Sequence, residues 1–202
     1  MMLISDILML WLAFIFAWVL ISRGVPIFQE LIHDMSEFFM EKALGPGKDL
    51  FEGREGSGSV AWMFHGMIWI CVGATFTFVE MWLGHEPDAI ASLSSIGYSP
   101  SLEQLSAASL LAAEGGILML LIGAGLHING RLSGAGLASD TNAILTSYGY
   151  STGLLLGFIG VHMGGDNSDL LGTVSDTIAI LIIVAILANH LLTIANRTND
   201  VA

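Results

Sequence analysis

The stretch "VAWMFHGMIWICVGATFTFVEMWLG", which runs from Val60 to Gly84, decides the fold class. It contains no Lys, Arg, Asp or Pro, and its only acidic residue is Glu80. A helix needs about 20 mostly apolar residues to cross a hydrocarbon layer of about 30 Å. The stretch therefore predicts a transmembrane helix, and one histidine, His65, lies near its start.

The composition of the whole chain also indicates a membrane protein. Of its 202 residues, 54% are hydrophobic and 12% are charged, whereas soluble domains contain about 25% charged residues. The formal net charge is −12. Because an acidic surface repels phosphate groups, we expect the chain to associate with a lipid bilayer and not with nucleic acid.

Four further stretches are long and apolar enough to cross a bilayer. All four prolines, which disrupt helices, fall outside these stretches. We therefore expect an all-α protein in which residues 1–22 form a first transmembrane helix and residues 60–195 form a bundle of four more. The four stretches are Leu3–Ser22, Leu105–Ile128, Ala143–Met163 and Val174–Ala195.

Residues 23–59, between the first and second spans, have a different pattern. At positions 25–44, the sequence "VPIFQELIHDMSEFFMEKAL" places apolar residues at helical spacing between acidic ones. This pattern predicts one amphipathic helix that lies along the membrane interface. The Gly-rich stretch that follows, Gly45–Ser59, predicts a flexible linker.

All six Lys and Arg residues fall on one side of this topology of five spans. Four lie between spans one and two, Arg131 lies between spans three and four, and Arg197 follows span five. By the positive-inside rule, residues 23–59 and the short tail of residues 196–202 are cytoplasmic, and the N-terminus is outside. We expect a multi-pass protein of the cell membrane.

Small residues recur at intervals of four or seven positions in three of the spans. Such faces allow membrane helices to pack closely. We therefore expect spans two to four to form the interior, while spans one and five face lipid. The residues are Gly66 and Gly73 in span two, Ala108, Ala112 and Gly116 in span three, and Gly149, Gly153 and Gly157 in span four.

Three histidines lie at or near the expected cytoplasmic ends of spans. His65 and His190 each lie five residues inside a span, which corresponds to a depth of about 7–8 Å. Two imidazoles at equal depth on facing helices are the arrangement that holds haem b through its two axial positions. His127, at the inner end of span three, is the third cofactor-binding candidate. The alternative is that each histidine only forms hydrogen bonds within the bundle.

Glu80 and Glu114 are the acidic residues within spans two and three. An ionisable residue in a membrane is a functional candidate by default, because it costs about 2.5–3.5 kcal/mol on insertion scales. Either residue is a candidate for carrying a proton. The alternative is a hydrogen-bonded acid that fixes helix packing.

The residues "FHGMIW", Phe64–Trp69, resemble haem–copper oxidase large subunits. In that family, a His-Gly pair near the start of a helix supplies an axial ligand to the low-spin haem. The resemblance implies that His65 is a haem ligand and that the chain is a short or diverged relative. The family's His-x-His pair is missing from this chain, so the resemblance does not imply oxygen reduction.

Three functions follow from these observations. The first is an electron-transfer or respiratory-complex component that binds haem b and is at most a part of an oxidoreductase. The second is a non-catalytic accessory or assembly subunit that works beside other membrane subunits. The third is a small proton or solute transporter. The sequence contains no complete catalytic constellation.

Overall fold

The computed structural model describes residues 29–30, 33–34, 55–86, 88, 93–95, 97–163 and 165–197, whose regular secondary structure is entirely helical. Four helices within them are long and apolar enough to cross a membrane. The expected first span lies outside the described residues, as does most of the amphipathic helix, of which residues 29–30 and 33–34 are helical. The four helices are α3 (Ser57–His85), α5 (Leu102–Ser133), α6 (Asp140–Met163) and α7 (Gly165–Ala195).

Each helix begins before the apolar stretch that predicted it. α3 begins at Ser57, so the last three residues of the expected linker are helical and buried. α7 begins at Gly165 and not at Val174, so most of the expected loop of residues 164–173 is helix. With 31 residues, α7 is about 46 Å long, which exceeds the hydrocarbon thickness of about 30 Å. Helices continue beyond the apolar layer because their backbone hydrogen bonds do not depend on the surrounding solvent.

Local signals set both ends of α5. The Ser101 side chain accepts a hydrogen bond from the Gln104 backbone, and the Gln104 side chain accepts one from the Ser101 backbone. This capping box satisfies two groups that a helix start leaves unpaired. At the other end, Gly134 adopts a left-handed conformation with φ 69°, which glycine reaches without steric cost and which ends the helix.

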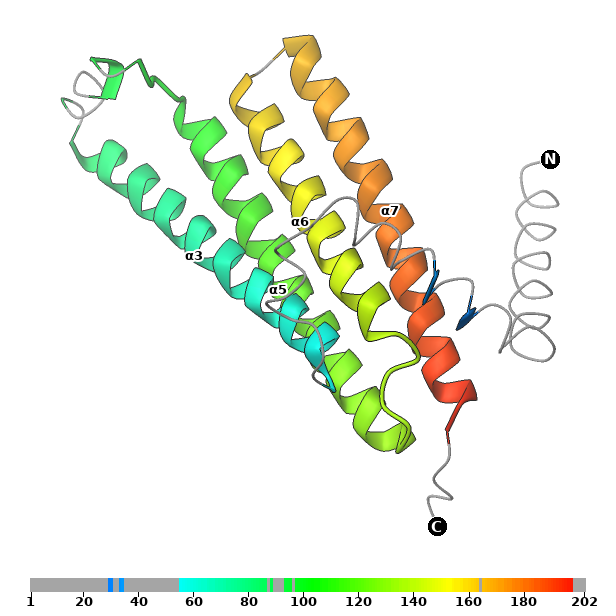
Figure 1. The fold of residues 1–202 in the computed structure, drawn as a ribbon. Coiled ribbons are helices and arrows are strands. Elements are labelled where there is room, and N and C mark those ends of the chain that lie inside the picture. The colour runs from blue at the N-terminus through cyan, green and yellow to red at the C-terminus, as the bar shows by residue number, and fades with distance from the viewer. Residues whose placement is uncertain are drawn as a thin grey trace, which may run out of the picture.

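The four helices form two antiparallel hairpins, α3 with α5 and α6 with α7 (Figure 1). α6 contacts each of the other three, whereas no Cα atom of α3 lies within 8 Å of one in α7. In its most apolar 18-residue stretch, 44% of α6 is buried, against 22% in both α3 and α7. α5 also contacts the other three helices, and 39% of its most apolar stretch is buried. α5 and α6 are therefore the two central helices, and α3 is as exposed as α7, although the sequence placed α3 in the interior.

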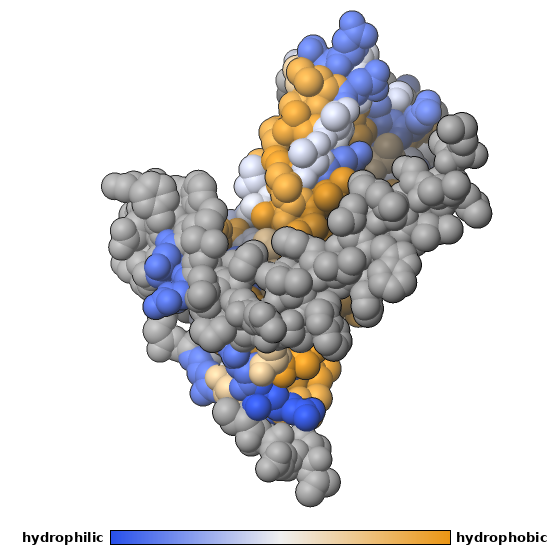
Figure 2. All heavy atoms as spheres, turned by 90° about the vertical axis from the view of Figure 1, so that its right-hand side faces the viewer, coloured by the Kyte–Doolittle hydropathy of each residue, from blue (hydrophilic) through white to orange (hydrophobic). Residues whose placement is uncertain are grey.

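The two ends of the bundle differ in charge. The end at which α3 and α6 begin carries Arg131 and Arg197, and we call it the basic end. The opposite end, the acidic end, has no Lys or Arg among its described residues, and its exposed carboxylates include Glu103, Asp166 and Asp169. On the face shown in Figure 2, apolar residues lie between hydrophilic residues at the two ends. The charge distribution agrees with a bundle that crosses a bilayer.

Glycines bring the backbones of α3 and α5 into contact. A Cβ atom on Gly66 would lie 2.7 Å from the carbonyl oxygen of Gly116, and a Cβ atom on Gly116 would lie 2.7 Å from that of Gly66. A Cβ atom on Gly73 would lie 2.8 Å from the backbone nitrogen of Ala113. The predicted packing role of these three glycines is confirmed.

The glycines of α6 instead receive side chains from α7. A Cβ atom on Gly149 would lie 2.7 Å from Cδ1 of Ile182, and one on Gly157 would lie 2.9 Å from Oγ of Ser175. The Ser175 hydroxyl donates a hydrogen bond of 2.8 Å to the carbonyl oxygen of Gly153. The predicted glycine face of α6 is therefore also an interface, in which side chains of α7 contact the backbone of α6.

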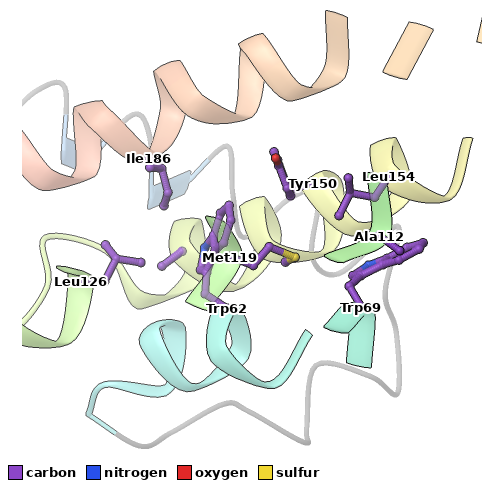
Figure 3. Close-up of a cluster of buried hydrophobic side chains, with 9 residues drawn as sticks. Trp62, Trp69, Ala112, Met119, Leu126, Tyr150, Leu154 and Ile186 are labelled. Atoms are coloured by element: carbon purple, nitrogen blue, oxygen red, sulfur yellow. The ribbon is translucent and has the colours of Figure 1, made fainter. Parts of the chain in front are cut away.

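A cluster of buried side chains joins all four helices (Figure 3). The Trp62 and Tyr150 rings lie 5.6 Å apart. The Trp69 indole N–H donates a hydrogen bond of 2.6 Å to the Ser151 hydroxyl. In this view, the cluster lies between α3 and α7. Its labelled members are Trp62 and Trp69 from α3, Ala112, Met119 and Leu126 from α5, Tyr150 and Leu154 from α6, and Ile186 from α7.

Candidate functional site

His65 lies at the interface between α3 and α6. Its Nδ1 atom is 2.8 Å from the carbonyl oxygen of Ala61. Because a carbonyl oxygen only accepts hydrogen bonds, Nδ1 carries the proton. The imidazole packs edge-on against Tyr148, with 4.5 Å between ring centroids, and the Ser147 hydroxyl lies 3.4 Å from Nδ1. His65 is therefore half-buried and in contact with α6.

His190 lies between α7 and α5. The amide nitrogen of Asn129 donates to Nδ1 of His190 at 3.1 Å and to the His190 carbonyl oxygen at 3.1 Å. Because an amide nitrogen only donates, Nδ1 of the neutral imidazole accepts and its Nε2 atom carries the proton. The structure thus pairs His190 with Asn129, which the sequence analysis did not single out.

The structure does not bring His65 and His190 together. Gly66, beside His65, packs against Gly116 of α5, whereas His190 packs against Gly125 and Asn129. Along α5, His190 is therefore more than two turns closer to the basic end. The start of α3 at Ser57 instead of Val60 moves His65 about 4.5 Å deeper than the sequence predicted, which accounts for part of this difference. Binding of haem b between these histidines stays a prediction.

His127 is exposed at the basic end, on the side of α5 that faces the start of α3. It lines a cavity of about 120 Å³ together with Glu55, Ser59 and Arg131. The cavity combines an acid, a hydroxyl, an imidazole and a guanidinium group. Within the described ranges, no three His, Cys, Asp or Glu side chains are grouped so that they could hold a metal ion.

A buried hydrogen-bond network joins the helices at the basic end. The Asn189 side chain is 1% exposed. Its amide nitrogen donates to the Ser139 carbonyl oxygen at 2.7 Å, and its oxygen accepts from the Ser139 backbone nitrogen at 3.2 Å. The Thr193 hydroxyl accepts from the backbone nitrogen of Ala138 at 2.9 Å. Side chains of α7 therefore bind the backbone of the loop between α5 and α6.

Asp140, at the start of α6, also caps the start of α3. Its carboxylate accepts a hydrogen bond of 2.9 Å from the backbone nitrogen of Gly58 and one of 3.3 Å from that of Gly56. The first backbone N–H groups of a helix have no partner within it, and a carboxylate there also interacts favourably with the helix dipole. Asp140 thereby fixes α3 to α6.

The described residues of the amphipathic segment join this network. The Gln29 amide donates to the carbonyl oxygen of Ala138 at 2.9 Å, and the Asn196 amide donates to the Gln29 side-chain oxygen. Nδ1 of His33 lies 3.2 Å from the Ser139 hydroxyl. This segment therefore contacts the loop between α5 and α6 and the end of α7.

A smaller polar cluster lies at the acidic end. Nδ1 of His162 bonds to the carbonyl oxygen of Phe158 at 2.9 Å, and Nε2 lies 3.0 Å from the Tyr98 hydroxyl. Burial raises the pKa of Tyr98 above its usual value of 10.0. Tyr98 therefore keeps its proton at neutral pH and donates it to Nε2, so both nitrogens of His162 have partners.

Glu114 lies in a very different environment. It is exposed on the side of α5 that faces away from α3 and α6, and no described residue forms a hydrogen bond or ion pair with it. Its neighbours on this face are apolar and exposed. We call this surface the α5 outer face and define it by Leu110, Glu114, Ile117, Leu118, Leu121 and Ile128.

Glu80 does not share this environment. It is half-buried on α3, seven residues beyond Gly73, and Gly73 packs against Ala113, the residue before Glu114. Because α3 and α5 are antiparallel, the two residues are therefore eight residues, or about 12 Å, apart in depth.

Comparisons with protein-family models, with curated proteins and with solved structures find no match for this chain. Its function therefore has to follow from the residues themselves.

Proposed function

We propose that this chain is a non-catalytic subunit of a membrane protein assembly and that it associates through the α5 outer face. The observation that carries the proposal is the exposed carboxyl group of Glu114 on an otherwise apolar surface. The bundle of apolar helices is compatible with an integral membrane protein.

The position of Glu114 along α5 puts its side chain inside the hydrocarbon layer. α5 has 32 residues and begins at Leu102, so Glu114 lies twelve residues from its start. At 1.5 Å per residue, the helix is about 48 Å long and Glu114 is about 18 Å from its start. A hydrocarbon layer of about 30 Å centred on the helix then begins about 9 Å from that start. Glu114 lies about 9 Å below its surface.

Two other exposed hydroxyls at similar depth are satisfied within their own helices. The hydroxyls of Thr75 and Thr177 each donate 2.8 Å hydrogen bonds to the carbonyl oxygen four residues earlier. Asp176, an exposed carboxyl at similar depth on α7, has no hydrogen bond or ion pair with a described residue, but it lies in a polar stretch with Thr173 and Thr177 and not on an apolar face. An ionised carboxylate only accepts hydrogen bonds, and the backbone N–H groups around Glu114 are already used by the helix. We propose that a partner from another polypeptide removes this group, which has no partner among the described residues, from lipid.

The experiment is to measure the mass of the particle isolated from its native membranes in a mild detergent by native mass spectrometry. We expect a mass above that of one 21.5 kDa chain, and we expect Glu114→Leu to shift the population toward the single chain. Thr177→Leu, which removes an exposed polar group from α7, is the matched control and leaves the mass unchanged. A single-chain mass for the wild type contradicts the proposal.

Haem-dependent electron transfer is a separate hypothesis, based on His65, His190 and the His-Gly resemblance. Its test is a visible absorption spectrum of the purified protein. A Soret band that disappears in both His65→Ala and His190→Ala supports it, and a colourless wild-type protein contradicts it.

A further inference from the structure

We propose that the partner on the α5 outer face is a second copy of this chain, so that Glu114 of one copy meets Glu114 of the other. This inference rests on the proposed function, because it names the partner that the α5 outer face binds. It depends on the spacing of exposed residues along α5 and on the chemistry of the carboxyl group.

Five exposed residues of α5 and the half-buried Ala124 form a heptad seam. Leu110, Glu114, Ile117, Leu121, Ala124 and Ile128 follow one another at alternating steps of four and three. Leu110 is 58% exposed, Ile117 51%, Leu121 65% and Ile128 56%. Repeats of 3.5 residues on a helix face produce left-handed pairing with another helix, in membranes as in water. We call these six residues the α5 seam.

The bundle itself does not use this seam. α5 packs against α3 through Ser109, Ala113 and Gly116, Leu154 of α6 packs against Gly115, and His190 of α7 packs against Gly125. The seam runs along none of these three sides. A heptad pattern on a further, exposed side is consistent with pairing outside the described bundle.

The symmetry of a pair in one bilayer favours a second copy. Two copies with the same orientation are related by a two-fold axis along the membrane normal, so each residue meets its own counterpart at equal depth. In such a pair, the α5 seam meets the same seam, and Glu114 occupies one layer between Leu and Ile layers. One polar residue in an apolar seam fixes register and the number of helices.

The chemistry of the carboxyl group is self-complementary. A protonated carboxyl has one O–H donor and a carbonyl acceptor, so two of them satisfy each other through two hydrogen bonds. Two ionised carboxylates repel, so such a pair keeps at least one shared proton. A cationic partner has to come from a different protein, because all six Lys and Arg residues of this chain lie outside the predicted spans.

The experiment uses a photo-reactive benzoylphenylalanine in the full chain, placed at Leu121 or, as the matched control, at the exposed Ile183 of α7. After irradiation in native membranes, we expect an adduct of two copies from position 121 and not from position 183. An adduct with a different protein overturns this inference but supports the proposed function. Adducts with lipid alone at position 121 overturn both.

A second measurement tests the symmetry. Because Cys71 is the only cysteine, Leu121→Cys in a Cys71→Ser background forms a disulfide only between identical positions of two copies. We expect oxidation to give dimers of this variant and not of the corresponding Ile183→Cys variant. Adding Glu114→Gln keeps a donor and an acceptor and preserves the dimers, whereas Glu114→Leu weakens association about five- to thirtyfold. Equal dimer yields at both cysteine positions overturn the inference.

Discussion

The basic end of the bundle and the α5 outer face both carry polar groups away from bulk water, but only the basic end supplies partners for them. There, Asn189 forms two hydrogen bonds with the backbone of Ser139, and Asp140 accepts two from the start of α3. On the α5 outer face, no described residue pairs with the Glu114 carboxyl. The contrast separates polar groups that have partners within the described bundle from one that, in our proposal, pairs with another molecule.

This difference has an energetic basis. A buried polar group with a partner contributes about 1 kcal/mol, whereas the same group without one costs about 1–3 kcal/mol. Removing a paired group should therefore destabilise the isolated chain, whereas removing Glu114 should not. The following predictions test this contrast in order of decreasing expected effect.

The largest effect is expected from Asn189→Leu. This change leaves the Ser139 N–H without its partner and removes one of the two hydrogen bonds that the Ser139 carbonyl oxygen accepts, the other coming from the Ala143 backbone, so the free energy of unfolding should fall by about 2–4 kcal/mol. The measurement is unfolding of the detergent-solubilised protein in a denaturing detergent, followed by circular dichroism. Leu187→Ala, on the exposed side of α7, is the control and should change stability by less than about 1 kcal/mol. Equal stabilities of the two variants would disprove a structural role for Asn189.

The next effect concerns close packing. Gly116→Ala places a methyl group 2.7 Å from the Gly66 backbone, which cannot move aside, and should cost about 1–3 kcal/mol. Gly149→Ala meets the flexible end of Ile182 and should cost less. In the same unfolding assay, Gly172→Ala has no neighbour within 4 Å and should be neutral or slightly stabilising. A stability loss for Gly116→Ala that is not the largest of the three would contradict the backbone contact between α3 and α5.

A smaller effect is expected at His190. Asn129→Leu removes its hydrogen-bond donor and should cost about 1 kcal/mol. In the wild type, nitrogen NMR should show His65 protonated at Nδ1 and His190 protonated at Nε2. In Asn129→Leu, only His190 should change its tautomer. The same tautomer for both histidines in the wild type would contradict the hydrogen bonds described here.

The smallest effect on the isolated chain is expected from Glu114→Leu. In the same unfolding assay, under detergent conditions that keep the chain monomeric, the free energy of unfolding should change by less than about 0.5 kcal/mol, because no described contact is lost. A loss as large as that of Asn189→Leu would show that Glu114 supports the fold of the single chain.

The sequence predicted the four described spans because each is a long apolar stretch without proline. It also predicted the glycine interfaces from their spacing. Helix ends were less predictable, since α7 continues through Asp166 and Asp169, where polar side chains face water. The predicted pairing of His65 with His190 required α3 and α7 to be neighbours, and the periodicity of a sequence does not show which helices are neighbours.

Asn189 and Asn129 were missed for a related reason. Asparagine occurs in many structural settings, so its presence alone predicts little. Within a mostly apolar span, however, its side chain requires a hydrogen-bond partner, and that requirement could have identified both residues. Glu114 was recognised because an acidic residue in a membrane helix is rare. Its outward orientation could only come from the structure.

The most direct test of the central claim is the exposure to lipid of spin labels in membranes that contain the intact assembly. A label at Leu121→Cys and one at Ile183→Cys, each in a Cys71→Ser background, are compared for relaxation by dissolved oxygen, which partitions into lipid. Both side chains are exposed in the single chain, Leu121 to 65% and Ile183 to 42%. If the α5 outer face is covered by protein, the label at position 121 will be shielded from oxygen and the label at position 183 will not. Equal access of oxygen to both labels would contradict the claim.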